Sequence, residues 1–359
     1  MGSPAKARWD LDTAPMEQVL KKLAGRRSQG LWAIAWARLK QNRAAFLACW
    51  FLALVGATSL LAPALPLPSP IVMHAIGEPV GPQIAWPAAQ GKFKGEYWAL
   101  SSIDRELVKL RGKAFGTWQT PPLLGTDSKG RDLLSRLIWG SRTSLFVALA
   151  ATLTSLIVGV LYGAVAALSG GWVDRLMMRV VDGLYALPFT FVVIFVLGLV
   201  GATHSLAGLS RESVFFLAIG ALYWLSMARV VRGQVLSLKH AEFVSAARAG
   251  GASMGWILAV HIVPNVLSLV VVFLTLTIPS VILSEAFLSF LGLGVEPPQV
   301  SWGLLAVDAL EAASPLRVYW WLIVFPSLAL ATVLFALTIL GDGLREALDP
   351  AALGRGVLR

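Results

Sequence analysis

Residues 124–136, LGTDSKGRDLLSR, bring together two glycines, two aspartates and three basic residues ahead of a long apolar stretch. A glycine beside a lysine could cradle a phosphate, as in a P-loop. That motif needs a Gly-Lys pair followed by Ser or Thr, between a strand and a helix. Here Lys129 precedes Gly130, and Arg131 follows. The spacing therefore excludes a P-loop.

Other catalytic patterns find no support, so we expect no catalytic residue and no metal ligand. H-E-x-x-H does not occur, and the histidines do not form a metal-binding spacing. They are His74, His204, His240 and His261. A membrane-embedded transferase remains an alternative. Such an enzyme would need acidic residues gathered at one membrane interface. Such a set exists, although it is spread along the chain: Glu285, Glu296, Asp308 and Glu311.

The composition indicates an integral membrane protein. Of the 359 residues, 57% are hydrophobic and 14% charged, against about 25% charged in soluble domains. The net charge of +10 fits the positive-inside bias and anionic lipid better than nucleic acid, so we expect no nucleic-acid partner. The single cysteine, Cys49, excludes an intrachain disulfide.

Six apolar runs are long enough to cross a bilayer, which takes about 20 residues. They cover about 44–65, 143–168, 180–201, 213–230, 265–284 and 319–340. The basic N-terminal segment and the acidic stretch 285–318 predict that both termini are cytoplasmic. The expected organisation is a cytoplasmic N-terminal segment (1–43), a first transmembrane helix (44–65), an external insertion and surface elbow (66–141), a core of five helices (142–341) and a cytoplasmic tail (342–359).

The 124–136 segment should form the elbow before the second span. Its apolar residues recur on one helical face and its polar residues on the other, which predicts an amphipathic helix on the outer membrane surface. The apolar face comprises Leu133, Leu134, Leu137 and Ile138, and the polar face Asp132, Ser135 and Arg136. Thr126 or Asp127 should cap an entry turn, with bends at Gly125 and Gly130. Arg131 and Arg136 should meet Asp127, Asp132 or lipid phosphate.

The loop 231–264, RGQVLSLKHAEFVSAARAGGASMGWILAVHIVPN, predicts a helix–turn–helix outside the bilayer. Gly250 and Gly251 provide the break. Phe243, Val244 and Ala247 share an apolar face, which should seat in a groove of another protein. The alternative, a loop resting on lipid headgroups, has too few basic residues on its polar face.

This loop resembles the EAA loop of permease subunits of binding-protein-dependent ABC importers, through Ala246, Ala247, Gly251 and Ile262-Val263-Pro264. Three further stretches, LLGTDSKGRDLLSRLIWGSRTSL, LSFLGLGVEPPQVSWGLL and LGDGLREALDP, are similar to C-type permeases of the oligopeptide/dipeptide group. The likeness covers about 122–350. It implies an all-α polytopic protein with the six-helix type I ABC importer permease fold and a cytoplasmic coupling helix.

The resemblance also implies which residues couple this chain to an ATPase subunit. A coupling helix near 242–251 would seat in the ATPase cleft. The implied coupling residues are Glu242, Ser245, Ala246, Ala247, Gly251 and Pro264. Two departures from the family pattern stand out: Ser245 replaces the glutamate that opens the EAA triplet, and Gly250 replaces a larger apolar residue.

The implied partners are a second homologous permease, two ATP-binding subunits, an extracytoplasmic substrate-binding protein and membrane lipid. The chain itself would bind no cofactor, since ATP and magnesium belong to the ATPase subunits. The implied location is the bacterial inner membrane. The implied substrates are di- or oligopeptides, with a nickel chelate or glutathione as alternatives within the group.

Polar residues inside the spans are candidates for the substrate pathway: Tyr223, Ser268, Thr275, Thr277 and Ser280. The alternative for each is a hydrogen bond to a helix carbonyl, which Ser and Thr often make. Asp182 and Arg229 lie near cytoplasmic ends, where an ion pair or snorkelling is expected. The predicted spans contain no chain of charged residues that could relay protons, which weighs against a proton-coupled transporter.

Overall fold

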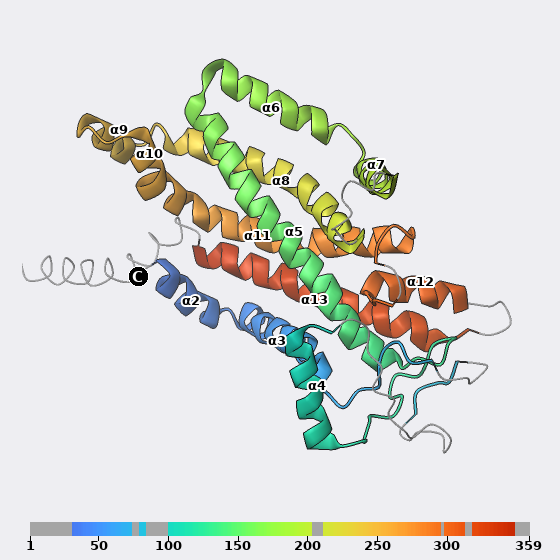
Figure 1. Ribbon diagram of the computed structural model, residues 1–359. Coiled ribbons are helices and arrows are strands. Elements are labelled where there is room, and N and C mark those ends of the chain that lie inside the picture. Colours follow the sequence, from blue (N-terminus) through green and yellow to red (C-terminus); the bar gives the residue numbers. More distant parts are fainter. Residues whose placement is uncertain are drawn as a thin grey trace, which may run out of the picture.

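The computed structural model describes residues 31–73, 79–83, 100–202, 211–295, 298–312 and 318–348. Within these ranges the regular structure is helical, with one isolated antiparallel bridge between Thr126 and Asp132. Long helices lie side by side, with the short helices α9 and α10 at one end of the bundle and α4 and α12 towards the other (Figure 1). We refer to these ends as the α9 end and the α12 end.

The helices follow one another in this order. They are α2 (Leu31–Gln41), α3 (Arg43–Leu60), the 3₁₀ turn η1 (Ala62–Ala64), α4 (Ser102–Phe115), α5 (Leu133–Ser169), α6 (Gly171–Tyr185), α7 (Phe189–Ala202), α8 (Arg211–Leu238), α9 (Glu242–Ala249), α10 (Met254–Ile257), a π-helical turn (Leu258–Ile262), α11 (Val263–Phe290), α12 (Trp302–Ala312) and α13 (Trp320–Leu348).

Helix α5 is continuous over 37 residues, and the predicted surface elbow is therefore wrong. The Asp132 carboxylate caps the helix by accepting a 2.7 Å hydrogen bond from the Ser135 amide. Leu133 and Arg136, the first-turn residues expected on opposite faces of a surface helix, are both buried. The polar face meets protein partners, so the segment forms the first turns of α5. Helix α5 also crosses the expected boundary at residue 142.

The candidate spans are fewer than the six predicted. Among the described residues, four helices are long and apolar enough to cross a membrane: α3, α5, α13 and the part of α11 from Leu269 to Phe290. Helices α6 and α7 satisfy the same test together, but they are bent by 88°. The predicted continuous span 180–201 is therefore wrong, because Pro188 has no N–H to carry the helix across the bend.

In the part of the chain that the structure describes, length and composition thus give four spans, or five when the bent pair counts as one, against the six predicted. The remaining predicted run, 213–230, lies in α8, a 28-residue helix that packs along α5. Glycine permits this close packing. A Cβ added at Gly159 of α5 would lie 2.5 Å from Cβ of Met227 in α8. These two helices therefore form the tight centre of the bundle.

Candidate functional site

Helix α9 and its flanking turns form the predicted helix–turn–helix, at the α9 end of the bundle (Figure 1). The helix ends at Gly250, and Gly251 has a φ of +82°, a conformation that strongly favours glycine. Ser253 then caps the start of α10, and its hydroxyl accepts a hydrogen bond from the Trp256 amide. The break predicted at Gly250–Gly251 is confirmed.

The faces of α9 differ from the predicted ones. Val244 is 0% exposed and packs with Val235 and Ile257, and Ala247 is packed against the same cluster. Phe243 is 41% exposed on another side of the helix. The prediction that all three share a docking face is therefore wrong, because residues three apart face the same way and adjacent residues do not.

The solvent-facing side of α9 instead carries small, polar and one aromatic side chain. We call this side the α9 outer face, and it comprises Glu242, Phe243, Ser245, Ala246 and Ala249. The predicted coupling residues Glu242, Ser245 and Ala246 belong to it. Ala247 faces inward, Gly251 shapes the turn, and Pro264 is exposed in the first turn of α11, where its missing N–H is tolerated.

Aromatic residues that the sequence reasoning missed connect α9 to the next segment. His261 in the π-helical turn lies with its ring 6.0 Å from that of Phe243 and 5.0 Å from that of Trp256. The spacing of 18 residues between Phe243 and His261 gave no periodic signal, because a tight turn separates them. The rings join α9 and the start of α11 into one unit.

Charged side chains tie α9's neighbours together. Arg232 of α8 makes a two-pronged ion pair with Asp174 of α6, at 2.5 and 2.6 Å. Lys239, near the end of α8, donates to the carbonyls of Ala167 and Leu168 in the last turn of α5. Cations commonly stabilise the free carbonyls there. The ends of α5, α6 and α8 are therefore fixed close to α9.

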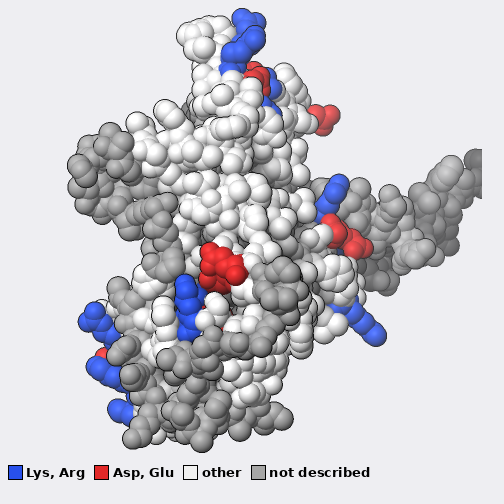
Figure 2. Space-filling model, turned by 90° about the vertical axis from the view of Figure 1, so that its right-hand side faces the viewer, with Lys and Arg blue, Asp and Glu red and all other residues white. Residues whose placement is uncertain are grey.

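The α12 end holds a buried ionic network made largely by the 124–136 segment. Arg131 and Arg136 each donate to Oδ2 of Asp127 at 2.6 Å, and both also reach Asp308 of α12, at 3.2 and 2.6 Å. The Asp127 carboxylate also accepts from two backbone amides of its turn. Acidic and basic side chains lie beside one another near the middle of the face drawn in Figure 2. The predicted pairing with Asp127 is confirmed, and Asp308 is the partner that the sequence did not indicate.

Asp132 caps helix α5, whereas the sequence predicted that it could pair with Arg131 or Arg136. Burial raises the pKa of its carboxyl group from 3.8 to about 7, against the lowering effect of the Ser135 amide. The negative charge of Asp127 raises the pKa further. Its second oxygen, Oδ1, has no hydrogen-bond partner among the described residues. Asp132 therefore caps α5 in an environment that favours the protonated form.

Glu285 does not belong to an outer loop, contrary to the prediction. It is fully buried in α11 and accepts hydrogen bonds from Ser144 and Ser289, at 2.9 and 2.8 Å. The same Ser144 hydroxyl accepts from the Trp302 amide of α12. Helices α5, α11 and α12 thus share one polar junction. The acidic set considered for a transferase is dispersed: Asp308 is ion-paired, Glu311 is exposed and Glu296 lies outside the described residues.

Most of the predicted pathway hydroxyls are satisfied locally. Thr275, Thr277 and Ser280 each donate to a carbonyl three or four residues earlier in α11. This confirms the alternative of helix hydrogen bonding for these three. The side chain of Ser268 lies outside the described residues. Tyr223 differs, because its hydroxyl reaches across to α11.

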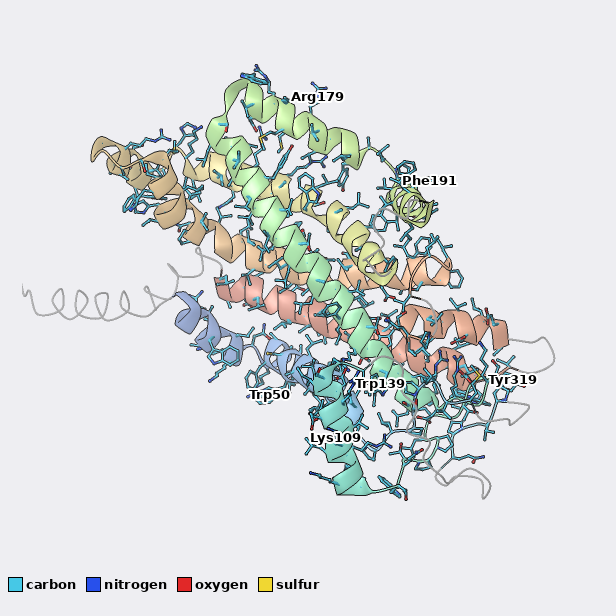
Figure 3. The ribbon with its side chains drawn as sticks, viewed as in Figure 1. Trp50, Lys109, Trp139, Arg179, Phe191 and Tyr319 are labelled. Carbon is cyan, nitrogen blue, oxygen red and sulfur yellow. The ribbon has the colours of Figure 1, made fainter. Side chains whose placement is uncertain are left out.

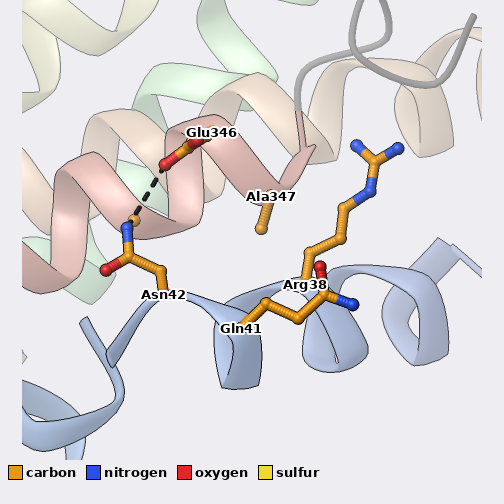
Figure 4. Close-up of a pocket in the computed structure, with 6 residues that line it drawn as sticks. Arg38, Gln41, Asn42, Glu346 and Ala347 are labelled. Carbon is orange, nitrogen blue, oxygen red and sulfur yellow. Dashed lines mark hydrogen bonds between the residues drawn. The ribbon is translucent and has the colours of Figure 1, made fainter. Parts of the chain in front are cut away.

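A small hollow at the α9 end lies between residues near the beginning and the end of the described chain (Figure 4). It has a volume of about 370 Å³ and lies between α2 and α13. Its lining residues are Arg38, Gln41, Asn42, Gly343, Glu346 and Ala347. The Asn42 side chain donates to Glu346 at 3.2 Å. The start of α3 and the end of α13 therefore lie at the same end of the bundle as α9.

Comparison with known families matches this architecture. Residues 155–353 match the family described as binding-protein-dependent transport system inner membrane component. Residues 30–75 match the N-terminal TM domain of oligopeptide transport permease C. The chain of the MetNI methionine ABC transporter in inward-facing conformations is similar in fold, with a TM-score of 0.50 at 17% identity over 60% of this chain and 98% of that chain.

Curated relatives are similar over most of the sequence. The oligopeptide transport system permease protein OppC of Escherichia coli K12 is 40% identical over 322 residues, 90% of this chain and 92% of that protein. OppC of Haemophilus influenzae is 47% identical over 63% of this chain and 69% of its own length. The dipeptide permease DppC of Bacillus subtilis is 42% identical over 63% and 68%. The chain therefore belongs to the family of inner membrane components of binding-protein-dependent transport systems, the permease subunits of ABC importers with the type I fold.

Proposed function

We propose that this chain is a peptide permease, forming half of the translocation pathway for di- or oligopeptides. The observation that carries this proposal is the 40% identity to an oligopeptide permease across 90% of the chain. Relatives named for dipeptide transport support the same substrate class. Nothing in the described residues favours a nickel chelate or glutathione.

The other half of the pathway comes from a second, homologous permease subunit. The hydroxyls of Thr275, Thr277 and Ser280 bond to their own helix, so few of the described polar groups of α11 remain to line an aqueous route. Importers of this type place the substrate site between two bundles. An extracytoplasmic binding protein delivers the peptide, and lipid surrounds the assembly.

Two ATP-binding subunits supply the energy, with ATP and magnesium bound to them and not to this chain. The α9 outer face seats in a cleft of one ATPase subunit. Small side chains at Ser245 and Ala246 allow the close approach that such packing needs. Phe243 provides an apolar contact, and Glu242 can meet a basic partner.

Closure of the ATPase dimer then moves α9 together with the helices tied to it. The Lys239 contacts to α5 and the Arg232–Asp174 pair to α6 transmit the displacement. Swinging a two-state equilibrium from 1:99 to 99:1 requires about 5.5 kcal/mol of differential binding. ATP binding by the closed dimer supplies this difference.

The α9 end of the bundle faces the cytoplasm, and the α12 end faces outward. Arg38, Lys40 and Arg43 lie at the α9 end, as the positive-inside bias predicts for the start of the first span. The described parts nearest the two termini, α2 and the end of α13, share this end. Both termini are then cytoplasmic.

The test is ATP-driven uptake of labelled di- to pentapeptides by the complete complex in proteoliposomes. Ala246→Arg on the α9 outer face should abolish peptide-stimulated ATP hydrolysis while membrane insertion persists. Ala114→Arg is the control, because it places the same side chain on the exposed surface of α4, at the other end of the bundle. This variant should keep peptide-stimulated ATP hydrolysis. Peptide uptake by this chain without any ATPase would contradict the assignment, as would wild-type coupling in Ala246→Arg.

A further inference from the structure

A groove lies where α6 bends into α7, beside α8 and α11. We call it the bend groove, and it is lined by Tyr185, Ala186, Pro188, Tyr223, Ser226 and Ser284, together with leucines and Phe189. Its volume is about 560 Å³, within the range of roughly 300–1,000 Å³ typical of small-molecule sites.

The backbone at this groove is interrupted inside an apolar segment. Helices α6 and α7 meet at 88°, and Pro188 prevents the helical hydrogen bonds from crossing the bend. Non-helical backbone at membrane depth is tolerated where it is buried in protein or lines a cavity. In transporters, broken helices of this kind commonly border the substrate site. The bend therefore marks the groove as a candidate binding site.

Hydroxyl groups from two helices converge on the groove. Tyr223 of α8 donates its single proton to the Ser280 carbonyl at 2.9 Å, so the hydroxyl of Ser284, 2.8 Å away, must donate to Tyr223. The lone pairs of Ser284 remain available as acceptors. Ser226 has no side-chain hydrogen bond within the described part of the chain and can both donate and accept. These groups match the N–H and C=O groups of a peptide.

A cation and an anion stand beside the groove. Arg229 donates to Asp182 at 3.0 Å, and the two side chains are 36% and 62% exposed. The guanidinium of Arg229 also lies 4.2 Å from the ring centre of Tyr185, a lining residue. On α8, Arg229 follows Ser226 by three residues, which places both on one helical face.

An ion pair this exposed contributes little to stability and opens easily. A free peptide carries a carboxylate at one end and an ammonium group at the other, so it can replace each partner of the pair. Stacking on Tyr185 holds the guanidinium in a fixed orientation, and its planar fork suits a carboxylate. The charges beside the groove thus complement a zwitterionic ligand.

We propose that the bend groove is a peptide-binding station in the pathway, in which Arg229 binds the C-terminal carboxylate and Asp182 the N-terminal ammonium group. Ser226 and Ser284 hydrogen-bond the amide groups between them. This inference rests on the proposed function and adds to it a specific recognition of free peptide termini by the permease itself.

The first experiment compares import of trialanine with import of its C-terminal amide by the complete complex. Arg229→Gln should reduce trialanine uptake about tenfold relative to wild type and reduce the discrimination between the two peptides. Arg179→Gln is the matched control, since Arg179 is exposed on the side of α6 away from α8 (Figure 3). It should behave as wild type. The binding protein is identical in every arm, so differences between variants belong to the permease.

The second experiment measures binding directly and does not need ATP. In a Cys49→Ala background, Ser284→Cys introduces a thiol in the groove, and a maleimide modifies it in the assembled complex. Excess trialanine should slow this modification several-fold, and the C-terminal amide should slow it less. Ser237→Cys, exposed on α8 away from the groove, should react at one rate throughout.

Two results would contradict the proposed binding station. One is an Arg229→Gln variant that discriminates between trialanine and its amide as the wild type does, and the other is a rate of Ser284→Cys modification that trialanine does not slow. Protection that the amide reproduces fully would also overturn it, because the groove would then not recognise the C-terminal carboxylate. Failure of the wild-type complex to import any peptide is a separate result, because it would overturn the proposed function.

Discussion

The guanidinium of Arg136 in α5 lies 2.6 Å from the carboxylate of Asp308 in α12, although 172 residues separate them in the chain. Arg136 is 1% exposed and Asp308 14%. The same arginine binds Asp127, so one side chain joins the turn before α5 to α12. Together with the Trp302 indole, which donates to the Leu137 carbonyl, this pair fixes α12 against α5.

Arg136→Leu should destabilise the protein strongly. The substitution removes one partner of a buried network and leaves Asp308 with the longer Arg131 contact alone. Breaking buried pairs in this way costs about 3–5 kcal/mol. Thermal unfolding of the purified complex should show it. Arg136→Leu combined with Asp308→Leu should recover part of the loss. Lys129→Leu, at an exposed position, should change little, and an equal effect there would refute the assignment.

Asp132→Asn should flatten the dependence of stability on pH. The folded-state pKa of about 7 lies above the ordinary value of 3.8, so the native protein binds the proton more tightly than the unfolded chain does. The resulting contribution is full below about pH 4 and is lost as the pH rises to about 7. Asparagine preserves the helix cap without titrating.

The measurement for Asp132 is the unfolding temperature at pH 5 and pH 8. The wild-type protein should lose more stability between these values than Asp132→Asn, by an amount on the order of a few kcal/mol. Glu106→Gln, on the exposed side of α4, serves as the control and should follow the wild type. A variant that loses as much stability as the wild type would contradict a raised pKa.

Gly159→Val should separate α5 from α8 or prevent folding. Its Cβ would meet Met227 at 2.5 Å and the Trp224 carbonyl at 3.0 Å, where neither backbone can yield easily. Overpacking of this kind costs about 1–3 kcal/mol or more. Expression level and detergent stability report the effect. Gly56→Val on α3 is the control, because nothing lies within 4 Å of its added Cβ.

Glu285→Leu should destabilise the junction of α5, α11 and α12, whereas Glu285→Gln should be milder. Leucine leaves the hydroxyls of Ser144 and Ser289 without their acceptor, at a cost of about 1–3 kcal/mol for a buried polar group. Glutamine keeps one acceptor oxygen. Comparing the unfolding temperatures of the two variants tests this, and equal values would mean that packing alone matters.

Cysteine labelling should establish the orientation in the membrane. In a Cys49→Ala background, Lys109→Cys on α4 should react with a membrane-impermeant maleimide added to intact spheroplasts, since this side chain is 66% exposed. Ser245→Cys on the α9 outer face should react only after permeabilisation. The opposite pattern would invert the proposed topology.

Local composition and spacing were sufficient for much of this protein. Apolar runs of about 20 residues can be stable only as helices in lipid, because every backbone group must be satisfied within the segment. The Gly250–Gly251 break was also local, since a φ of +82° at Gly251 favours glycine in any context. The Asp182–Arg229 ion pair followed from two charges near the ends of apolar segments.

Tertiary structure decided the features that depend on contacts between distant segments. A polar helical face at Asp132 and Arg136 has the same pattern whether water or protein covers it, and only the arrival of Asp308 turned a predicted surface elbow into a buried helix start. Glu285 likewise sits at the end of an apolar run, where sequence suggests exposure, but Ser144 provides a buried partner. Val244 and Phe243 are adjacent apolar residues of α9, and the position of Val235 determined which one faces inward. Sequence periodicity gives the faces of a helix, whereas the neighbours that cover each face are fixed only when the chain folds.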